Sequence, residues 1–149
     1  MLDAPIAHHF HAMGCPCELR IGGQSPQRVI ERCLKEVARF ESKYSRYQPD
    51  SIVSKINHNA GKAAVALDPE TGSILDYAQT CFELSNGLFD ITSGVLRTIW
   101  NKDTKLFPAQ SSINEVLSLI GWEKVERSLE QIYLPQPGMQ IDLGGVVKE

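Results

Sequence analysis

Four short segments of the chain combine glycine, aromatic and charged residues in a way that suits a phosphorylated ligand. Glycine lets a backbone approach a ligand closely, and tyrosine beside arginine can stack on a planar ring while pairing with a phosphate or carboxylate. Free N–H groups at the start of a helix bind anions. The segments are 13–14, 43–51, 85–94 and 142–148. Each also has a simpler structural explanation, which the sequence leaves open.

The first two segments follow elements that would present them to a ligand. Met13 and Gly14 separate two predicted strands, and a plain hairpin turn is the favoured interpretation there from sequence alone. Arg46 and Tyr47 follow a long predicted helix, where they could hold a ring and an anion. A solvated helix end with an aromatic lid over the core explains the same residues at least as well.

The third segment joins two predicted helices. Helix caps at 86–87 and 92–93 account for most of its residues without any functional role. The caps leave Leu88, Phe89 and Asp90 unexplained. These three residues are therefore candidates for contact with a ligand.

Metal binding has weak support in the sequence. Asp142 and Lys148 flank two glycines and could bind a phosphate or a divalent cation, but the spacing matches neither a dinucleotide fingerprint nor a P-loop. A histidine cluster near the start lacks an acidic or cysteine partner at ligand spacing, so strand-surface histidines are the better interpretation. The cluster consists of His8, His9 and His11.

The cysteines indicate little about the compartment. Cys15 and Cys17 would share one face of a strand, which makes a joint metal contact possible but poorly supported without a second pair. Cys33 and Cys81 fall on the apolar faces of two predicted helices, so we expect buried free thiols there.

The N-terminal elements follow from hydrophobic periodicity. Alternation predicts two strands within 6–21, and apolar residues at helical spacing predict a long helix over 26–44. Ser25 is expected to cap that helix, with Pro26 in its first turn. A short helical stripe around 52–56 follows.

The middle of the chain continues this mixture of strands and helices. A short strand is predicted over 63–67, and Asp68 and Pro69 begin the next helix. Asn86 and Gly87 should end that helix in the left-handed conformation. A shorter helical stretch is predicted over 93–100.

The C-terminal third contains one more helix and three strands. The capping box from Ser112 to Glu115 should begin the helix, and Gly121 should close it. The strands are a hairpin over 124–127 and 131–134, and a final strand over 139–143. Strands and helices alternate irregularly, which favours an α+β fold with a mixed or antiparallel sheet and packed helices.

Composition fits one ordinary globular domain. The chain has 149 residues, of which 42% are hydrophobic and 22% charged, and its net charge of −3 disfavours a nucleic acid as the main partner. No apolar run approaches the roughly 18 residues of a transmembrane helix. The first residues lack the basic and apolar regions of a secretory signal, and no lipobox is visible.

The four segments, in this order, resemble the N-terminal half of the ApbE family, the FAD:protein FMN transferases. The resemblance implies a T-fold-like flavin-binding architecture and a Mg²⁺-dependent reaction. Such enzymes split FAD, attach FMN through a phosphoester to a threonine or serine of a target protein, and release AMP. Typical targets are membrane redox subunits. Family members are often exported and lipid-anchored, so the localisation of this chain stays open, with cytoplasmic the expectation for the chain as written.

The resemblance also implies roles for individual residues. Gly145 occupies a metal position, where it could offer only its backbone oxygen to Mg²⁺. The catalytic residues are expected in the family's C-terminal half. The residues expected to contact FAD are Met13, Tyr47, Leu88, Phe89, Asp90, Asp142 and Lys148.

The end of the sequence affects what activity is expected. A strand, two glycines and an apolar stretch are typical of a strand that leads into a helix, so residues 1–149 are expected to be the N-terminal portion of one domain whose C-terminal portion is absent. The alternative function is a non-catalytic FAD-binding half-domain that needs a partner, which could be a second copy of the chain in a homo-oligomer. A structural domain with coincidental loops and no flavin affinity is the third interpretation.

Overall fold

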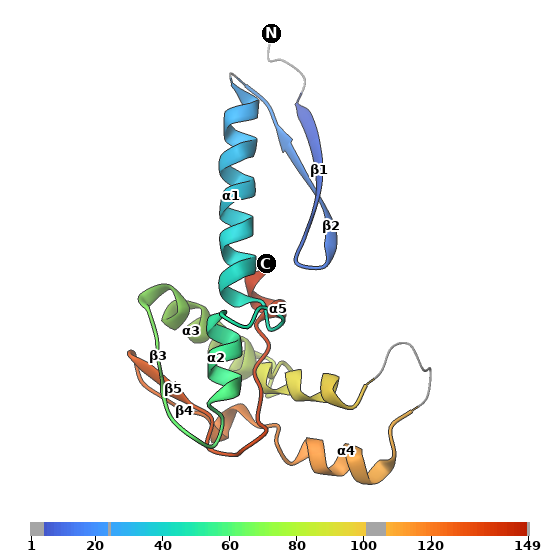
Figure 1. Cartoon of the computed structure of the whole chain (residues 1–149), viewed down its shortest axis with the longest axis vertical. Helices are drawn as coiled ribbons and strands as arrows, with labels where there is room; N and C mark the ends of the chain where they lie inside the picture. Colours follow the sequence, from blue (N-terminus) through green and yellow to red (C-terminus); the bar gives the residue numbers. More distant parts are fainter. Residues whose placement is uncertain (1–4, 24, 101–106, 149) are drawn as a thin grey trace.

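The computed structural model describes residues 5–23, 25–100 and 107–148. Within these residues the chain forms a two-stranded antiparallel sheet, β1-β2, and a three-stranded sheet in the order β3-β5-β4. Helices separate and flank the sheets (Figure 1). This arrangement confirms the predicted α+β class.

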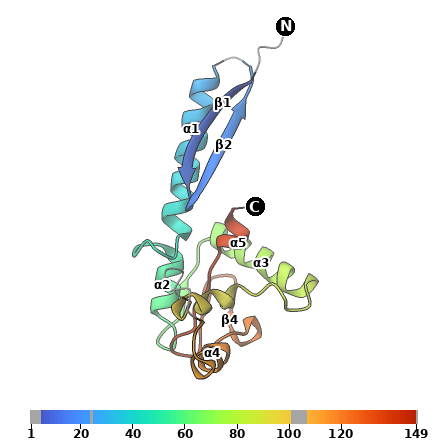
Figure 2. The same ribbon diagram turned by 90° about the vertical axis from the view of Figure 1, so that its right-hand side faces the viewer.

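The N-terminal third forms an arm that projects from the rest of the molecule. Strands β1 (Ile6–Ala12) and β2 (Cys15–Ile21) make the predicted hairpin, and helix α1 (Pro26–Tyr44) has the predicted bounds. The hairpin lies alongside α1 in both side views, with its turn directed toward the body (Figures 1 and 2). Met13 and Gly14 at that turn have φ angles of 52° and 74°, the left-handed geometry that a tight hairpin requires.

The predicted cap of α1 is wrong. Ser25 has a φ of 60° and its side chain makes no capping hydrogen bond. A capping serine needs an extended backbone so that its hydroxyl can reach the free N–H groups, and the left-handed conformation of Ser25 prevents this. Pro26, whose fixed φ suits the first helical turn, still begins the helix.

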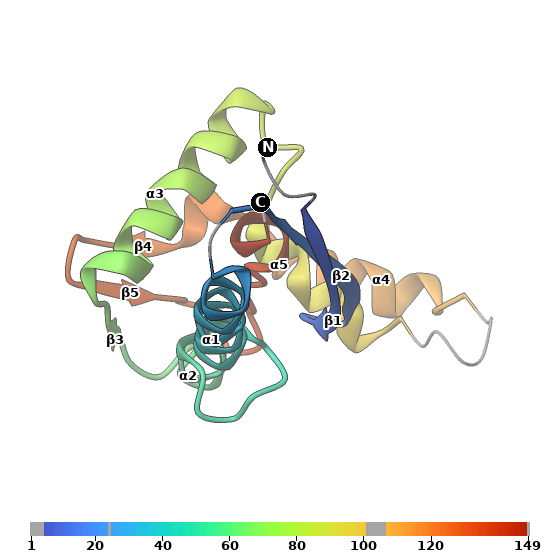
Figure 3. The ribbon, with the colours of Figure 1, turned by 90° about the horizontal axis from the view of Figure 1, so that it is seen from above.

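Two helices follow α1 in the body, and a side-chain cap begins each of them. The Ser51 hydroxyl accepts from the Ser54 N–H at 3.0 Å and begins α2 (Ile52–His58). Asp68 caps α3 (Pro69–Leu84) by accepting from the Thr71 N–H at 3.2 Å. Figure 3 shows α3 extending away from the axis of α1.

The small sheet and the left-handed end of α3 agree with prediction. β3 (Val65–Ala66) and β4 (Glu126–Arg127) pair on either side of β5 (Gln131–Tyr133). Beyond α3, Asn86 and Gly87 have φ angles of 53° and 81°. The strands are shorter than the predicted runs.

Two helical segments begin earlier than predicted. The 3₁₀ helix η1 (Ile91–Thr98) begins after Asp90, whose carboxylate accepts from the Thr92 N–H at 2.7 Å, so the cap lies before Thr92. Helix α4 (Gln110–Leu117) begins after Ala109, which places the predicted capping serine inside its first turn. Gly121, with a φ of 148°, does not close α4 but precedes the 3₁₀ turn η2 (Trp122–Lys124).

The predicted final strand over 139–143 does not form, although the apolar side chains of this segment are buried. Met139, Ile141 and Leu143 are fully buried, yet the segment joins neither sheet. The Asn57 side chain accepts from the Ile141 N–H at 2.7 Å and donates to the Ile141 carbonyl at 3.0 Å. At Ile141 this amide side chain therefore takes the place of a neighbouring strand, while the Asp142 N–H donates to the Ile91 carbonyl at 2.8 Å. Helix α5 (Gly144–Val147) follows directly.

The core lies in the body rather than in the arm. Helices α2 and α3, strand β5 and segment 139–143 contribute most of its fully buried side chains. Cys33 and Cys81 are free but only half-buried, which corrects the expectation of buried thiols. No helix in ranges 5–23, 25–100 and 107–148 is long and apolar enough to cross a membrane.

Candidate functional site

A cleft of about 370 Å³ lies where the arm meets the body. Its walls come from the β1–β2 turn, the C-terminal end of α1, the 3₁₀ helix η1 and segment 142–148. Figure 1 shows the hairpin turn and α5 on the same side of the end of α1. The volume lies near the lower end of the range for ligand pockets, so the cleft can hold one part of a dinucleotide.

Four of the predicted site residues line this cleft together. Met13 comes from the hairpin turn, Tyr47 from the loop after α1, and Asp142 and Lys148 from the two ends of the last segment. They are up to 135 residues apart in sequence, yet they face a single space. Three of the four segments, 13–14, 43–51 and 142–148, therefore face one cleft.

The third predicted segment lies beside the cleft rather than in its lining. Leu88 is 92% exposed, and Phe89 packs at the margin of the core. Phe89 also lies against Gly145, where an added Cβ would be 3.2 Å from the Phe89 ring. Asp90 holds the start of η1 and accepts from the Trp122 N–H at 3.0 Å. Contact of these residues with FAD stays a prediction.

Asp142 is the residue at which the charges of the cleft meet. Its Oδ1 accepts from the Gly144 N–H at 2.9 Å, which holds the turn into α5. Its Oδ2 lies 3.2 Å from Nη1 of Arg46 and 3.5 Å from Nε of Arg97. Asp142 therefore joins the loop after α1 to η1 and α5.

Arg46 lines the cleft and is held in place by several hydrogen bonds. Its side chain is 12% exposed, and besides Asp142 it donates to the Gly94 carbonyl and to Gln140 Oε1, each at 2.8 Å. Gly94 must be glycine here, because an added Cβ would lie 2.7 Å from the Cβ of Asp142. A planar guanidinium can serve these three acceptors at once, whereas an ammonium presents a single point charge.

Arg97 is a cleft residue that sequence analysis missed. Its Nη1 donates to the Tyr47 hydroxyl at 3.3 Å, and its side chain is 53% exposed. No local motif marks it, because its partners lie 50 and 45 residues away in the sequence. Arg46 lies within a predicted segment, but no local motif indicates its ion pair with Asp142.

The hairpin turn is tied to the helix that it faces. The Met13 N–H donates to Oε1 of Glu41 on α1 at 2.9 Å. Nearby, Nζ of Lys148 lies 3.9 Å from Sγ of Cys15. These contacts hold the hairpin turn and the last described residues beside the same cleft.

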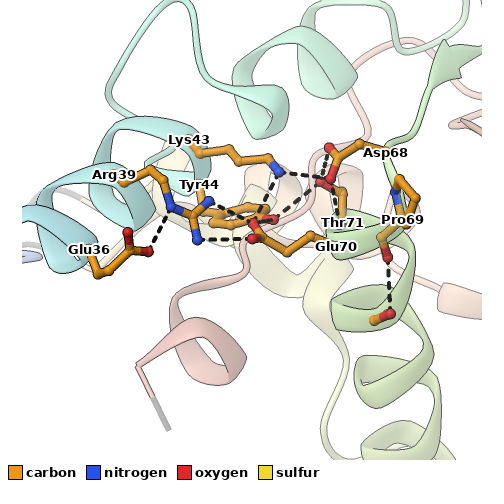
Figure 4. A network of polar contacts seen from close by, with 9 residues as sticks. Glu36, Arg39, Lys43, Tyr44, Asp68, Pro69, Glu70 and Thr71 are labelled. Carbon is orange, nitrogen blue, oxygen red and sulfur yellow. Dashed lines mark hydrogen bonds and ion pairs between the residues drawn. The ribbon is translucent and has the colours of Figure 1, made fainter. Parts of the chain in front are cut away.

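A polar network holds the C-terminal end of α1 against the start of α3 (Figure 4). Arg39 makes a two-point contact with Glu70, at 3.1 and 2.9 Å. Lys43 donates to Asp68 at 2.8 Å and to Glu70 at 3.0 Å, and the Tyr44 hydroxyl donates to Glu70 at 2.6 Å. The network therefore positions the helix end from which Arg46 and Tyr47 continue.

The network lowers the pKa values of its two carboxyl groups, Asp68 and Glu70. The hydrogen bond from Arg39, followed by those from Tyr44 and Lys43, lowers the pKa of Glu70 to about 2. Partial burial acts to raise the pKa of Asp68, but hydrogen bonds from Lys43 and Thr71 outweigh it and leave that pKa well below its ordinary value. Both carboxylates are thus held in their charged forms.

The described residues do not by themselves form a Mg²⁺ site. Within 5–23, 25–100 and 107–148, no three His, Cys, Asp or Glu side chains gather closely enough to hold a metal ion. Gly145 is exposed and can supply only a backbone oxygen, whereas Mg²⁺ requires six oxygen ligands in octahedral geometry. The donor set present here does not fit a complete magnesium centre.

Comparison with known proteins defines the class to which this fold and cleft belong. The ApbE family matches residues 13–149, so the chain belongs to the ApbE family. The chain is 31% identical to the FAD:protein FMN transferase of Chlamydia pneumoniae over 128 residues, covering 83% of this chain and 40% of that protein. It is 27% identical to the enzyme of the same name from Treponema pallidum, covering 91% of this chain and 41% of that protein.

Solved structures agree with this assignment. The ApbE protein of Thermotoga maritima superposes with a TM-score of 0.86 at 28% identity, covering 97% of this chain and 48% of that one. The flavin transferase ApbE of Vibrio cholerae gives a TM-score of 0.89 at 17% identity, covering 99% and 50%, and so shows the shared fold. The resemblance inferred from sequence is confirmed, and the chain spans about half the length of these relatives.

Proposed function

We propose that this chain forms the FAD-binding half of an FAD:protein FMN transferase. The observation that carries the proposal is the cleft in which Met13, Tyr47, Asp142 and Lys148 converge, in a chain that belongs to the ApbE family. The names of the similar proteins from Chlamydia pneumoniae and Treponema pallidum support the same activity.

The proposed reaction transfers FMN to the acceptor by substitution at the FMN phosphorus. The hydroxyl of an acceptor threonine or serine attacks the FMN phosphorus, the anhydride bond to the AMP half breaks, and the hydroxyl proton passes to a base. AMP leaves with the bridging oxygen. Such reactions depend mainly on positioning and electrostatic stabilisation. The proposal includes Mg²⁺ dependence and a membrane redox subunit as the acceptor, but no step is assigned to Mg²⁺ in this chain.

The residues of this chain would bind and orient the dinucleotide. Tyr47 is 75% exposed at the cleft and can stack on a flavin or adenine ring. Arg97 and Lys148 place positive charge beside it, while Arg46 neutralises Asp142. The cleft therefore combines a stacking surface with groups that attract phosphate.

Equilibrium dialysis against FAD tests the binding part of the proposal. The chain should bind FAD, and Tyr47→Ala should weaken binding roughly 10-fold, because base–aromatic stacking is worth about 1–3 kcal/mol. Tyr77→Ala is the matched control, since Tyr77 is exposed on α3 outside the cleft. Failure of the chain to bind FAD with or without Mg²⁺ would contradict the proposal.

A labelling assay separates catalysis from binding. The chain is incubated with FAD, Mg²⁺ and an acceptor protein, and the denaturing gel is inspected for a fluorescent acceptor band. The second candidate function is a non-catalytic FAD-binding half-domain that needs a partner. FAD binding without labelling or AMP release would support this second function.

A further inference from the structure

We propose that Arg97 is the phosphate-binding side chain of the cleft. When the dinucleotide binds, the Arg97 guanidinium moves away from Asp142 and Tyr47 and binds the diphosphate. The inference rests on the proposed function for the identity of the ligand. It adds a specificity-determining residue that would distinguish a phosphorylated flavin from its unphosphorylated form.

Arg97 is held loosely in the present arrangement. Its Nε lies 3.5 Å from Oδ2 of Asp142, and its Nη1 lies 3.3 Å from the Tyr47 hydroxyl. Both distances exceed the usual 2.7–3.2 Å of an N–H···O hydrogen bond. The side chain is 53% exposed, so water already screens these contacts. Its release therefore costs little.

Asp142 keeps two other partners after Arg97 leaves. Asp142 keeps the Arg46 guanidinium at 3.2 Å on one oxygen and the Gly144 N–H at 2.9 Å on the other. Arg46 itself stays in place, because its side chain is 12% exposed and is also held by Gly94 and Gln140. The two arginines thus have different roles: Arg46 is fixed and Arg97 is exchangeable.

A phosphate is the ligand that best uses the exchangeable arginine. A guanidinium offers five N–H donors in a planar fork that matches two phosphate oxygens, and charge-assisted bonds of this kind prefer about 2.7–2.9 Å. Asp142 cannot compete well, since Arg46 and Gly144 already share its charge. Lys148 lines the same cleft and adds a second positive charge. Departure of Arg97 also frees Tyr47 to face a ring.

Binding measurements with three probes test the inference: FAD, riboflavin and inorganic pyrophosphate. Arg97→Gln should weaken FAD and pyrophosphate binding about 10- to 100-fold, the value of charge-assisted hydrogen bonds, and leave riboflavin binding unchanged. Arg97→Lys should fall between wild type and Arg97→Gln, because the charge remains but the fork is lost. Arg20→Gln is the control, since Arg20 pairs with Glu18 on the hairpin surface outside the cleft.

The outcomes separate this inference from the proposed function. If the wild type binds FAD and Arg97→Gln binds it equally well, the role of Arg97 is overturned and the proposed function stands. An equal loss of FAD and riboflavin binding would also overturn it, because it would indicate a structural role. If the wild type bound pyrophosphate through Arg97 but not FAD, the phosphate site would stand and the proposed function would fall. Binding of neither would overturn both.

Discussion

Leu88 and Asp90 are separated by one residue, but the structure gives them opposite surroundings. Asp90 accepts hydrogen bonds from Thr92 and from the Trp122 backbone, so it connects η1 to η2. Leu88 is 92% exposed and contributes nothing visible to packing. Both were expected to contact FAD. We therefore ask which of the two residues contacts a ligand and which stabilises the fold.

Stability measurements on two variants answer this question. Asp90→Ala should lower the free energy of unfolding by about 2 kcal/mol, because two backbone N–H groups lose their acceptor. Leu88→Ala should change it by less than about 0.5 kcal/mol, as is usual for exposed positions. Urea unfolding followed by circular dichroism measures both. A weaker affinity of Leu88→Ala for FAD, at unchanged stability, would support the predicted ligand contact.

In segment 139–143, hydrogen bonds from one side chain replace those that a neighbouring strand would make at Ile141. The segment is buried like a central strand, but its backbone at Ile141 is satisfied by Asn57 from α2. Unpaired buried backbone groups are costly, so Asn57 is the residue that lets the segment lie in the core. Asp142 follows directly, and its position in the cleft depends on this anchoring.

Asn57→Ala should therefore be strongly destabilising. We expect the free energy of unfolding to fall by about 2–4 kcal/mol, because a buried N–H and a buried carbonyl lose their partners together. Asn59→Ala is the matched control, since the Asn59 side chain donates to the exposed Lys55 carbonyl one turn back. Chemical denaturation compares the two variants. Equal stability of Asn57→Ala and Asn59→Ala would show that the two hydrogen bonds between the Asn57 side chain and the Ile141 backbone contribute nothing.

The polar network between α1 and α3 makes stability depend on pH at the element scale. The pKa of Glu70 is lowered from 4.5 to about 2 in the folded chain, so its charged form stabilises the fold above its ordinary pKa. That contribution is lost as the pH falls from about 5 toward 2. The Glu70 side chain is 37% exposed, so solvent screening limits the effect to about 1 kcal/mol.

Glu70→Gln provides the corresponding measurement. The variant should be about 1 kcal/mol less stable than wild type at about pH 6, and the difference should shrink as the pH is lowered to about 3. Glu115→Gln, an exposed change on α4, controls for the loss of one negative charge. A difference between wild type and Glu70→Gln that did not vary with pH would contradict the assigned pKa shift.

At the scale of the whole molecule, the cleft lies between the hairpin turn of the arm and the last segment of the body. The arm of β1, β2 and α1 projects from the body in Figures 1 and 2, and the hairpin turn returns to the body at Met13. A ligand in the cleft would contact the turn of the arm and segment 142–148 of the body at once. Binding should therefore stabilise both parts together.

Hydrogen exchange with and without FAD tests this coupling. Amides at 12–15 and 142–148 should exchange more slowly when FAD is bound, with the β4–β5 hairpin as the internal control. At 100 times the dissociation constant, binding contributes about 2.7 kcal/mol, so exchange that requires release of the ligand slows up to roughly 100-fold. Protection confined to the body would show that the ligand does not reach the arm.

Periodicity in the sequence determined most of the elements. The bounds of α1, the β1–β2 hairpin and the burial of 139–143 all follow from the spacing of apolar residues, because this spacing sets which face of an element leaves water. Local motifs also marked the segments that line the cleft. These features depend on neighbours within a few residues, which a sequence displays directly.

Tertiary structure alone decided how the site is assembled. Arg46 meets Asp142 across 96 residues, and Asn57 meets Ile141 across 84, so no local pattern could indicate either pair. The left-handed backbone of Ser25 and the early start of α4 likewise overrode plausible capping motifs. A cap or an ion pair forms only where the folded chain brings donor and acceptor within reach, and that distance is set by packing rather than by spacing along the chain.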